Sequence, residues 1–158
     1  MYHYTFGGLR NVWLVNGYTV KQTPMGEAVA FADGQGLERS ICIALAAKPA
    51  HLSGAELRFI RQSGLLMSQA ALGKMIGADA QSVARWEKHG RVPKWADKLV
   101  RLVFTAHAEG NQPIRRVVDR LNTVERLVQQ SIVMRERKGA WTSTVKPVEP
   151  QGESLATA

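Results

Sequence analysis

The sequence contains a single cysteine, Cys42, among its 158 residues. One thiol can neither close an internal disulfide nor supply the cluster of thiolates that a structural zinc site needs, so we expect a reducing compartment and no bound metal. We interpret Cys42 as a small core residue. No apolar run approaches the roughly 18 residues of a membrane helix, and the N-terminus lacks a basic region followed by an apolar one. We therefore expect a cytoplasmic protein with no membrane contact.

Signatures of catalysis are also missing from the sequence. There is no Walker-type phosphate loop, no set of His and Cys with metal-ligand spacing and no plausible catalytic triad. Gly34-Gln35-Gly36 is an isolated glycine-rich fragment in front of a weak helical pattern. We therefore expect a protein that is not an enzyme and that uses no cofactor.

Acidic residues are scarce: 13 Asp and Glu stand against 21 Lys and Arg, which gives a formal net charge of +8. The excess of positive charge lies in residues 51–110 and 111–138, whereas residues 1–50 and 139–158 are close to neutral. A strongly basic chain favours a polyanionic partner over an acidic small substrate. Nucleic acid is therefore the leading candidate for the partner.

Residues 1–50 predict a small domain with a β-hairpin and a helix. Asn16-Gly17 is the dipeptide that best tolerates a type I′ turn, and β-rich runs flank it on both sides. A third β-rich run follows the break at Thr23-Pro24, so we expect one small antiparallel sheet. An amphipathic helical spacing then begins at Leu37. The β-rich runs are residues 11–15, 18–22 and 27–31, and the helical run is 37–45.

Residues 51–110 predict a domain of short helices. Ser53, Ser68 and Asp79 are residues of the type that caps helix N-termini, and apolar residues flank each of them as in a hydrophobic staple. Gly77 lies in the short gap between the second and third helices, and glycine readily takes the positive φ of a tight turn. A gap of about three residues favours a helix-turn-helix over an ordinary corner of a helix bundle.

The helical pattern of residues 68–90 separates a buried side from an outward side. The residues expected in the core are Leu72, Ile76, Val83, Trp86 and, on a closing helix that begins at Pro93, Trp95. Gly73 is small enough to let the second helix cross close to the third. Four residues of the third helix remain outward: Ala80, Gln81, Ala84 and Arg85.

The order of residue types over 68–90 is Ser-Gln, a small residue, Gly, a β-branched residue and an aromatic residue before Glu. This order resembles the Xre/Cro family of DNA-binding regulators, and the resemblance implies a helix-turn-helix that binds double-stranded DNA. The string from Leu52 to Arg61, together with residues 83–88, also looks like the C-terminal domain of MqsA-type (YgiT-type) antitoxins, which are transcription regulators. Their N-terminal domain holds zinc with paired cysteines. Residues 1–50 have no cysteine pair, so the resemblance does not extend to zinc binding or to toxin binding through that domain.

The outward residues of the third helix suit the edges of DNA bases. We expect Gln81 to pair with adenine and Arg85 with guanine, and both match base-contacting positions of the resembled family. Ala80 and Ala84 offer little beyond contact with a thymine methyl group. We expect phosphate contacts from side chains and helix N-terminal amides around the two helices: Ser68, Gln69, Ser82, Lys88, Arg91 and Lys94.

Residues 111–138 predict a long C-terminal helix, with Asn111 as its cap and Pro113 in its first turn. Its apolar stripe either covers the N-terminal sheet or pairs with the same helix of a second subunit. We favour a homodimer through Leu121, Val124 and Val128, because regulators of this kind read two half-sites. Residues 139–158 are polar and aperiodic, and we expect them to be disordered.

These patterns together predict a mainly α protein with a small N-terminal antiparallel β element, an α+β fold with a helix-turn-helix domain and a long C-terminal helix. The predicted function is that of a sequence-specific, dimeric transcriptional regulator that binds double-stranded DNA; regulation of its own operon is one role open to it, and the sequence leaves both repression and activation open. The alternative is an antitoxin that neutralises a protein toxin, or binds another regulatory partner, and uses DNA binding for autoregulation. A small protein that co-purifies with the chain would favour the alternative.

Overall fold

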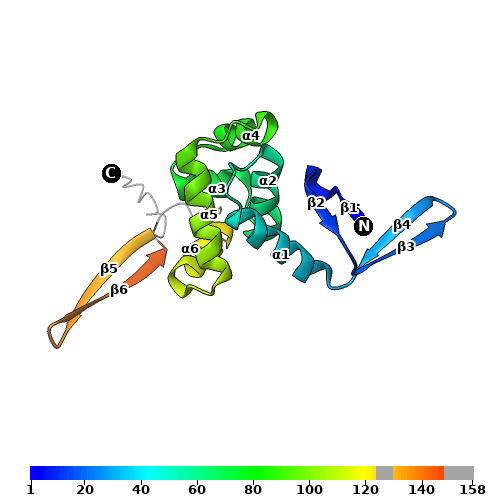
Figure 1. Cartoon of the computed structure of the whole chain (residues 1–158). Helices are drawn as coiled ribbons and strands as arrows, with labels where there is room; N and C mark the ends of the chain where they lie inside the picture. The colour runs from blue at the N-terminus through cyan, green and yellow to red at the C-terminus, as the bar shows by residue number, and fades with distance from the viewer. Residues whose placement is uncertain (124–129, 148–158) are drawn as a thin grey trace, which may run out of the picture. The chain divides into compact units, whose positions relative to one another are not determined.

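The computed structural model of the chain describes residues 1–123 and 130–147 (Figure 1). These residues contain six α-helices, two short helical turns and three antiparallel sheets of two strands each, so the fold is α+β. Residues 1–122 form one compact unit, and a second unit begins at Thr123. No helix in the described part of the chain is long and apolar enough to span a membrane.

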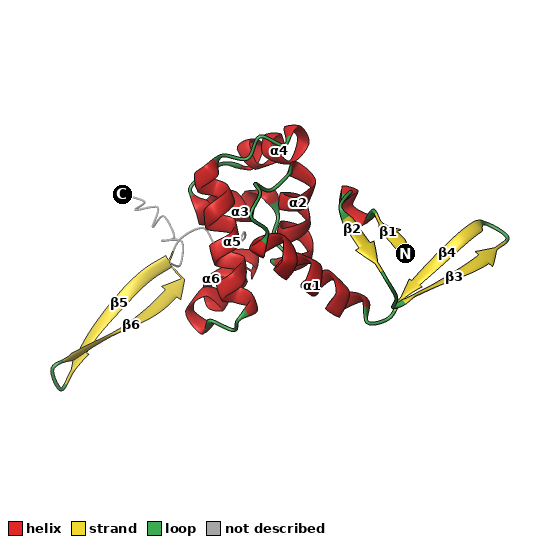
Figure 2. Ribbon diagram, viewed as in Figure 1, coloured by secondary structure: helices red, strands yellow, loops and turns green. Residues whose placement is uncertain are grey.

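The N-terminal strands form two separate sheets (Figure 2). β1 (Tyr2–Tyr4) pairs with β2 (Val12–Leu14), and β3 (Tyr18–Thr23) pairs with β4 (Gly26–Phe31), both in antiparallel register. The predicted hairpin across Asn16-Gly17 and the predicted three-stranded sheet are therefore wrong. Gly17 does adopt a positive φ of 78°, but it lies between the two sheets. The tight turn is at Pro24-Met25, where the fixed φ of proline suits the second position of a β-turn.

Aromatic side chains connect these two sheets. The ring centroid of Tyr2 lies 5.2 Å from that of Tyr18 and 5.8 Å from that of Phe31. Tyr4 is buried, and its ring lies 5.4 Å from Phe31 and 6.4 Å from Phe59. Contacts of this kind join residues that are far apart in the sequence, so the packing of the two sheets on each other depends on tertiary contacts.

Helix α1 (Gly34–Ala47) joins the N-terminal sheets to the remaining helices. It begins at Asp33, whose carboxylate accepts a hydrogen bond of 3.1 Å from a backbone N–H three residues later. The predicted helix and the core position of Cys42 are confirmed, since Cys42 is fully buried. α1 packs on α5 (Lys94–Ala108), which keeps the first 50 residues in the same compact unit as the later helices. The boundary expected after residue 50 is therefore not a boundary between units.

The three predicted helix starts after residue 50 are confirmed. Ser53 and Glu56 form a reciprocal capping box, in which each side chain accepts a hydrogen bond from the backbone N–H of the other residue. Ser68 and Asp79 each accept a hydrogen bond from the backbone N–H three residues later. The helices that begin at these caps are α2 (Gly54–Phe59), which continues into a π-helical turn (Ile60–Gly64), α3 (Gln69–Ile76) and α4 (Ala80–His89).

One apolar core holds the helices of the first unit together. Its fully buried side chains come from α2 and its π-helical turn, α3, α4 and α5: Leu57, Ile60, Leu72, Val83 and Val100. Trp95, predicted to lie in this core, is instead 49% exposed. Its ring meets that of the half-buried Trp86 edge to face, with the centroids 5.8 Å apart. Helical spacing therefore places Trp95 beside the core, but it does not show that the outer side of the indole ring is exposed to solvent.

The C-terminal part of the chain differs from its prediction. α6 (Gln112–Thr123) covers only the start of the helix predicted over residues 111–138, because β5 (Gln130–Arg137) is a strand. β5 pairs antiparallel with β6 (Ala140–Pro147), so the disorder predicted for residues 139–158 is wrong over this second strand. The cause is the turn at Lys138-Gly139, where both residues have a positive φ, as a type I′ hairpin turn requires.

Two of the three predicted dimer residues lie outside the described residues. These are Val124 and Val128, and residues 148–158 lie outside as well, while Leu121 belongs to α6. Dimerisation through these residues stays a prediction. α6 buries Val118 and leaves Val117 46% exposed, so one side of the helix packs within the first unit.

Candidate nucleic-acid interface

Two glycines shape the connection between α3 and α4. Gly77 ends α3 with a φ of 82°, a conformation that residues with a Cβ rarely adopt. Gly73 approaches the turn so closely that a Cβ there would lie 2.8 Å from the carbonyl oxygen of Ala78. The sequence predicted that α3 approaches α4 closely at Gly73. In the structure, Gly73 lies against the backbone of the turn that joins the two helices. The turn from Gly77 to Asp79 is therefore fixed by backbone sterics.

Helix α4 has a core side and an outward side. Val83 is fully buried, whereas Gln81 and Arg85 are exposed. These two exposed residues are four positions apart, so they lie on the same face of the helix. Ala80 and Ala84 are half-buried. The structure thus brings the two predicted base readers to the surface together.

A buried ion pair holds α4 against α2 and α3. The Arg61 guanidinium donates to both carboxylate oxygens of Glu87, with 2.5 Å from Nε to Oε1 and 3.1 Å from Nη2 to Oε2. The two side chains are only 7% and 6% exposed. Arg61 also donates through Nη1 to the carbonyl oxygen of Met67, and Gln69 donates to Glu87 Oε2 at 2.8 Å. A bidentate pair restrains both the position and the rotation of the helix that carries it.

The end of α4 lies against the start of α2. A Cβ at Gly54 would lie 2.1 Å from the carbonyl oxygen of Glu87, so only glycine fits at the first residue of α2. Gly90 ends α4 with a φ of 72° and directs the chain toward Pro93. The orientation of the outward face of α4 is therefore determined at both ends of the helix.

Four of the six predicted phosphate contacts lie at the surface: Ser68, Lys88, Arg91 and Lys94. The Ser68 hydroxyl accepts the Ala71 N–H at 3.0 Å as the cap of α3. The lysines and the arginine lie in the last turn of α4, in the loop that follows it and at the start of α5. Basic side chains are consequently concentrated after the predicted base-reading positions of α4.

The other two predicted phosphate contacts, Gln69 and Ser82, form hydrogen bonds within the protein. The Gln69 amide donates to Glu87, so it completes the buried ion pair. The Ser82 hydroxyl accepts a hydrogen bond of 3.2 Å from Arg85 Nη2. Both side chains therefore position other site residues in this structure.

The carboxylate of Asp79 lies beside the outward face of α4. It accepts the Ser82 N–H at 2.6 Å as the cap of the helix. Hydrogen bonds from Ser82, together with the positive charge of Arg85, lower the pKa of Asp79 below its ordinary value. An ionised carboxylate at a helix N-terminus interacts favourably with the helix dipole, so Asp79 stabilises the start of α4.

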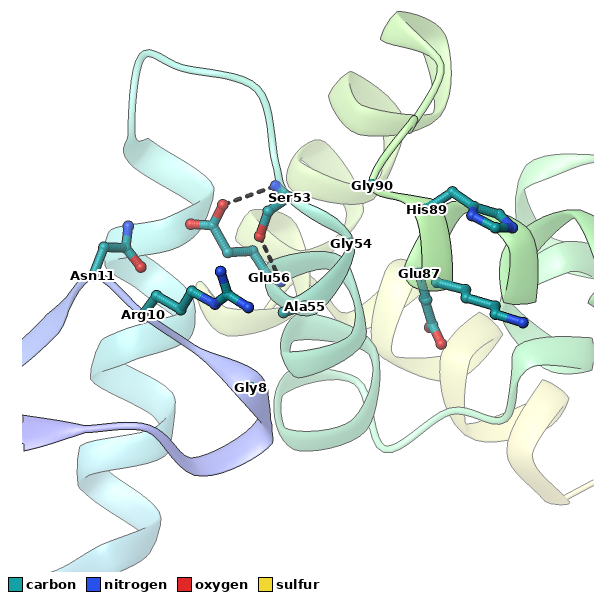
Figure 3. A pocket seen from close by; sticks show the side chains of 11 residues that line it. Gly8, Arg10, Asn11, Ser53, Gly54, Ala55, Glu56, Glu87, His89 and Gly90 are labelled. Atoms are coloured by element: carbon teal, nitrogen blue, oxygen red, sulfur yellow. Dashed lines mark hydrogen bonds between the residues drawn. The ribbon is translucent and has the colours of Figure 1, made fainter.

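Three surface hollows adjoin α4. One, of about 450 Å³, is lined by Arg85, Trp86, His89 and Arg91. A second, of about 620 Å³, lies among α2, α3 and α4 and is lined partly by Arg58 and Lys88. The third, of about 580 Å³, is lined by Arg10 and Asn11 of the N-terminal segment and by Lys88 and His89. Figure 3 labels Arg10, Asn11 and His89 among the residues that line it. Basic residues from outside α3 and α4 thus reach the candidate interface.

Arg58 and Arg10 are not among the residues that the sequence predicted to contact DNA. Arg58 is exposed on α2, and the helical spacing that follows the Ser53 cap is a signal that could have shown this. Arg10 precedes β2 by two positions, and no local pattern connects it with α4, which comes far later in the chain.

Within the described residues, no group of three or more His, Cys, Asp or Glu could hold a metal ion. No protein-family model, curated protein or solved structure matches the chain. The function is therefore inferred from the geometry and the charge of the surface around α4.

Proposed function

We propose that the chain is a sequence-specific DNA-binding transcriptional regulator in which α3, the Gly77 turn and α4 form a helix-turn-helix. The observation that carries this proposal is the exposed pair Gln81 and Arg85 on a helix that the buried Arg61–Glu87 ion pair holds in place. A rigid helix with polar side chains outward and basic residues at its end has the properties of a major-groove reader.

The dimensions and the side chains of α4 suit the major groove. An α-helix with its side chains is about 10–12 Å across, which fits a major groove about 12 Å wide, and the ten residues of α4 make it about 15 Å long. In this proposal the Gln81 amide pairs with the N6 and N7 edge of adenine, and the Arg85 guanidinium pairs with O6 and N7 of guanine. Ala80 and Ala84 are small enough to let the helix approach the bases and to contact thymine methyl groups.

Exposed basic residues supply the phosphate contacts in this proposal. Lys88, Arg91 and Lys94 follow the base readers along the chain, and Ser68 adds a hydroxyl at the start of α3. Each neutralised phosphate releases counterions, which makes the affinity depend on salt concentration. Gln69 acts indirectly, because its amide is used to hold Glu87 and therefore the position of α4.

The resemblance to Xre/Cro regulators and to the DNA-binding domain of MqsA-type antitoxins supports the same proposal. Regulators of this kind read two half-sites about one helical turn apart, which requires a two-fold axis. We therefore propose that the chain acts as a homodimer.

Selection of bound sites from a random pool of duplex DNA tests the proposed function. The wild type should enrich a sequence motif, and a pool without enrichment would contradict the proposal. On the selected duplex, Gln81→Ala and Arg85→Ala should each cost about 1–3 kcal/mol and relax preference at one base position only. Lys88→Ala is the contrasting variant: it should weaken binding to all sequences alike and lower the salt slope by about one. Equal losses on every sequence for Arg85→Ala would refute its assignment as a base reader.

A further inference from the structure

We infer that the N-terminal segment extends the DNA interface, through a contact between Arg10 and the phosphate backbone next to the end of α4. This inference rests on the proposed function and adds a contact outside the two helices of the proposed motif. It starts from the hollow of about 580 Å³ between the loop after the short helical turn η1 (Phe6–Gly8), the start of α2 and the end of α4. Figure 3 shows the Arg10 side chain extending from that loop toward Ala55 at the start of α2.

The loop that carries Arg10 is held firmly against α2. Leu9 is only 1% exposed. Gly7 has a φ of 67°, and a Cβ there would lie 3.0 Å from the Phe59 ring, so any other residue would strain this part of the loop. The Arg10 carbonyl oxygen accepts a hydrogen bond of 2.7 Å from His3 Nε2. The backbone on both sides of Arg10 is thus already ordered, which reduces the entropy lost when the side chain binds a phosphate.

Cations outside this hollow neutralise the two acidic residues that line it, so its two basic residues give its surroundings a net positive charge. The Arg10 and Lys88 side chains are both exposed. The two acidic residues of the lining already have cationic partners from elsewhere, since Glu56 pairs with Lys48 at 2.6 Å and Glu87 pairs with Arg61 at 2.5 Å. The charges of Arg10 and Lys88 therefore remain available for an anionic partner.

A DNA backbone is the anionic partner to which this inference commits. The carboxylates of Glu56 and Glu87 are almost fully buried and paired with cations, so they do not offset the exposed Arg10 and Lys88 side chains. A polyanion gains from each of these cations, because every phosphate that is neutralised releases counterions.

The position of Arg10 fits the direction in which α4 is proposed to lie on DNA. Gln81 and Arg85 face the bases from the first part of the helix, and Lys88 and His89 form its last turn. In this orientation the N-terminal part of α4 lies in the groove, and its C-terminal end lies next to the DNA backbone that borders the groove. Arg10 lies at the hollow beyond this last turn, so the phosphate it contacts belongs to base pairs that flank those read by α4.

Two duplexes that contain the selected site test this inference. The short duplex ends at the selected base pairs, and the long duplex has about one helical turn, ~10 base pairs, of unselected sequence added on each side. Arg10→Ala should lower the affinity for the long duplex about three- to fivefold and should lower its salt slope by about 0.9. The affinity for the short duplex should not change. Lys21→Ala, at an exposed position of β3, is the matched control and should leave both affinities unchanged.

The possible results separate this inference from the proposed function. If the wild type selects a motif and Arg10→Ala binds the long duplex as tightly as Lys21→Ala does, the inference is wrong and the proposed function stands. Equal losses on the short and the long duplex would also overturn it, because the contact would then not lie in the flanks. If the wild type selects no motif, the proposed function fails first. Arg10→Lys should restore the long-duplex affinity, since a lysine also binds phosphate.

Discussion

Replacement of Arg61 by methionine tests whether the buried ion pair holds α4 in place. Methionine has a similar length and no charge. In Arg61→Met, the Glu87 carboxylate, which is 6% exposed, loses both hydrogen bonds from Arg61 and keeps the one from the Gln69 amide. The Met67 carbonyl oxygen also loses its hydrogen bond from Arg61. Removal of one partner of a buried ion pair costs about 3–5 kcal/mol, because the other charge stays buried without compensation. This loss is a large part of the roughly 5–15 kcal/mol by which a domain is stable.

Urea unfolding followed by circular dichroism measures this loss. We expect the midpoint to fall for Arg61→Met while the slope of free energy against urea stays the same, because unfolding exposes the same surface. Arg58→Ala is the matched control on the same helix, since Arg58 is exposed, and it should stay within about 0.5 kcal/mol of the wild type. The double variant Arg61→Met/Glu87→Met should recover most of the stability, because no buried charge remains unpaired.

Two results would refute this reasoning. A loss below about 1 kcal/mol for Arg61→Met would mean that the pair is worth no more than an exposed one. Equal losses in the single and the double variant would mean that the unpaired charge is not the cause. The double variant also separates stability from recognition. It should be folded and yet bind the selected duplex more weakly than the wild type, because the bidentate contact no longer orients α4.

Four further predictions concern packing, titration and assembly. Gly73→Ala should lower the free energy of unfolding by about 1–3 kcal/mol, because the added Cβ would overlap the Ala78 carbonyl oxygen; thermal melting would detect this, and an unchanged melt would contradict the close approach. Burial, with a smaller effect of Glu38, raises the pKa of Cys42 to about 12, so its thiol should react with an aromatic disulfide reagent at mildly alkaline pH only after urea unfolds the chain. Burial tends to raise the pKa of Glu56, but hydrogen bonds from Lys48 and Ser53 lower it overall. The contribution of Glu56 to stability should therefore be complete above the ordinary carboxyl pKa and disappear as the pH falls through the lower folded pKa. Glu56→Gln should flatten this part of a stability profile measured between neutral pH and about pH 3. Leu121→Glu should convert a dimer into a monomer in light scattering, because each subunit would have to desolvate a buried charge; a variant that stays dimeric would place the interface elsewhere.

The helix boundaries around the candidate site are determined by the sequence alone. Ser53, Ser68 and Asp79 cap helices through hydrogen bonds that span only three residues, so the residues that make each bond are visible in the sequence. The positive φ of Gly77 is likewise a property of one residue in one turn. Helical periodicity also shows which side chains of α4 lie opposite Val83, whatever Val83 packs against. The exposure of Gln81 and Arg85 follows from that periodicity.

The tertiary structure alone decided which distant segments meet. The β-rich runs are visible in the sequence, but only the tertiary structure shows that the hairpin of β3 and β4 packs on β1 and β2 through rings such as Tyr2 and Tyr18. The apolar spacing of residues 130–137 suits a helix or a strand, and pairing with β6 makes this segment a strand. The ion pair joins residues 26 positions apart, and Arg10 lines the same hollow as the end of α4 because its loop packs on α2. Apolar burial has no direction, so a sequence pattern shows that a side is buried but not which segment buries it.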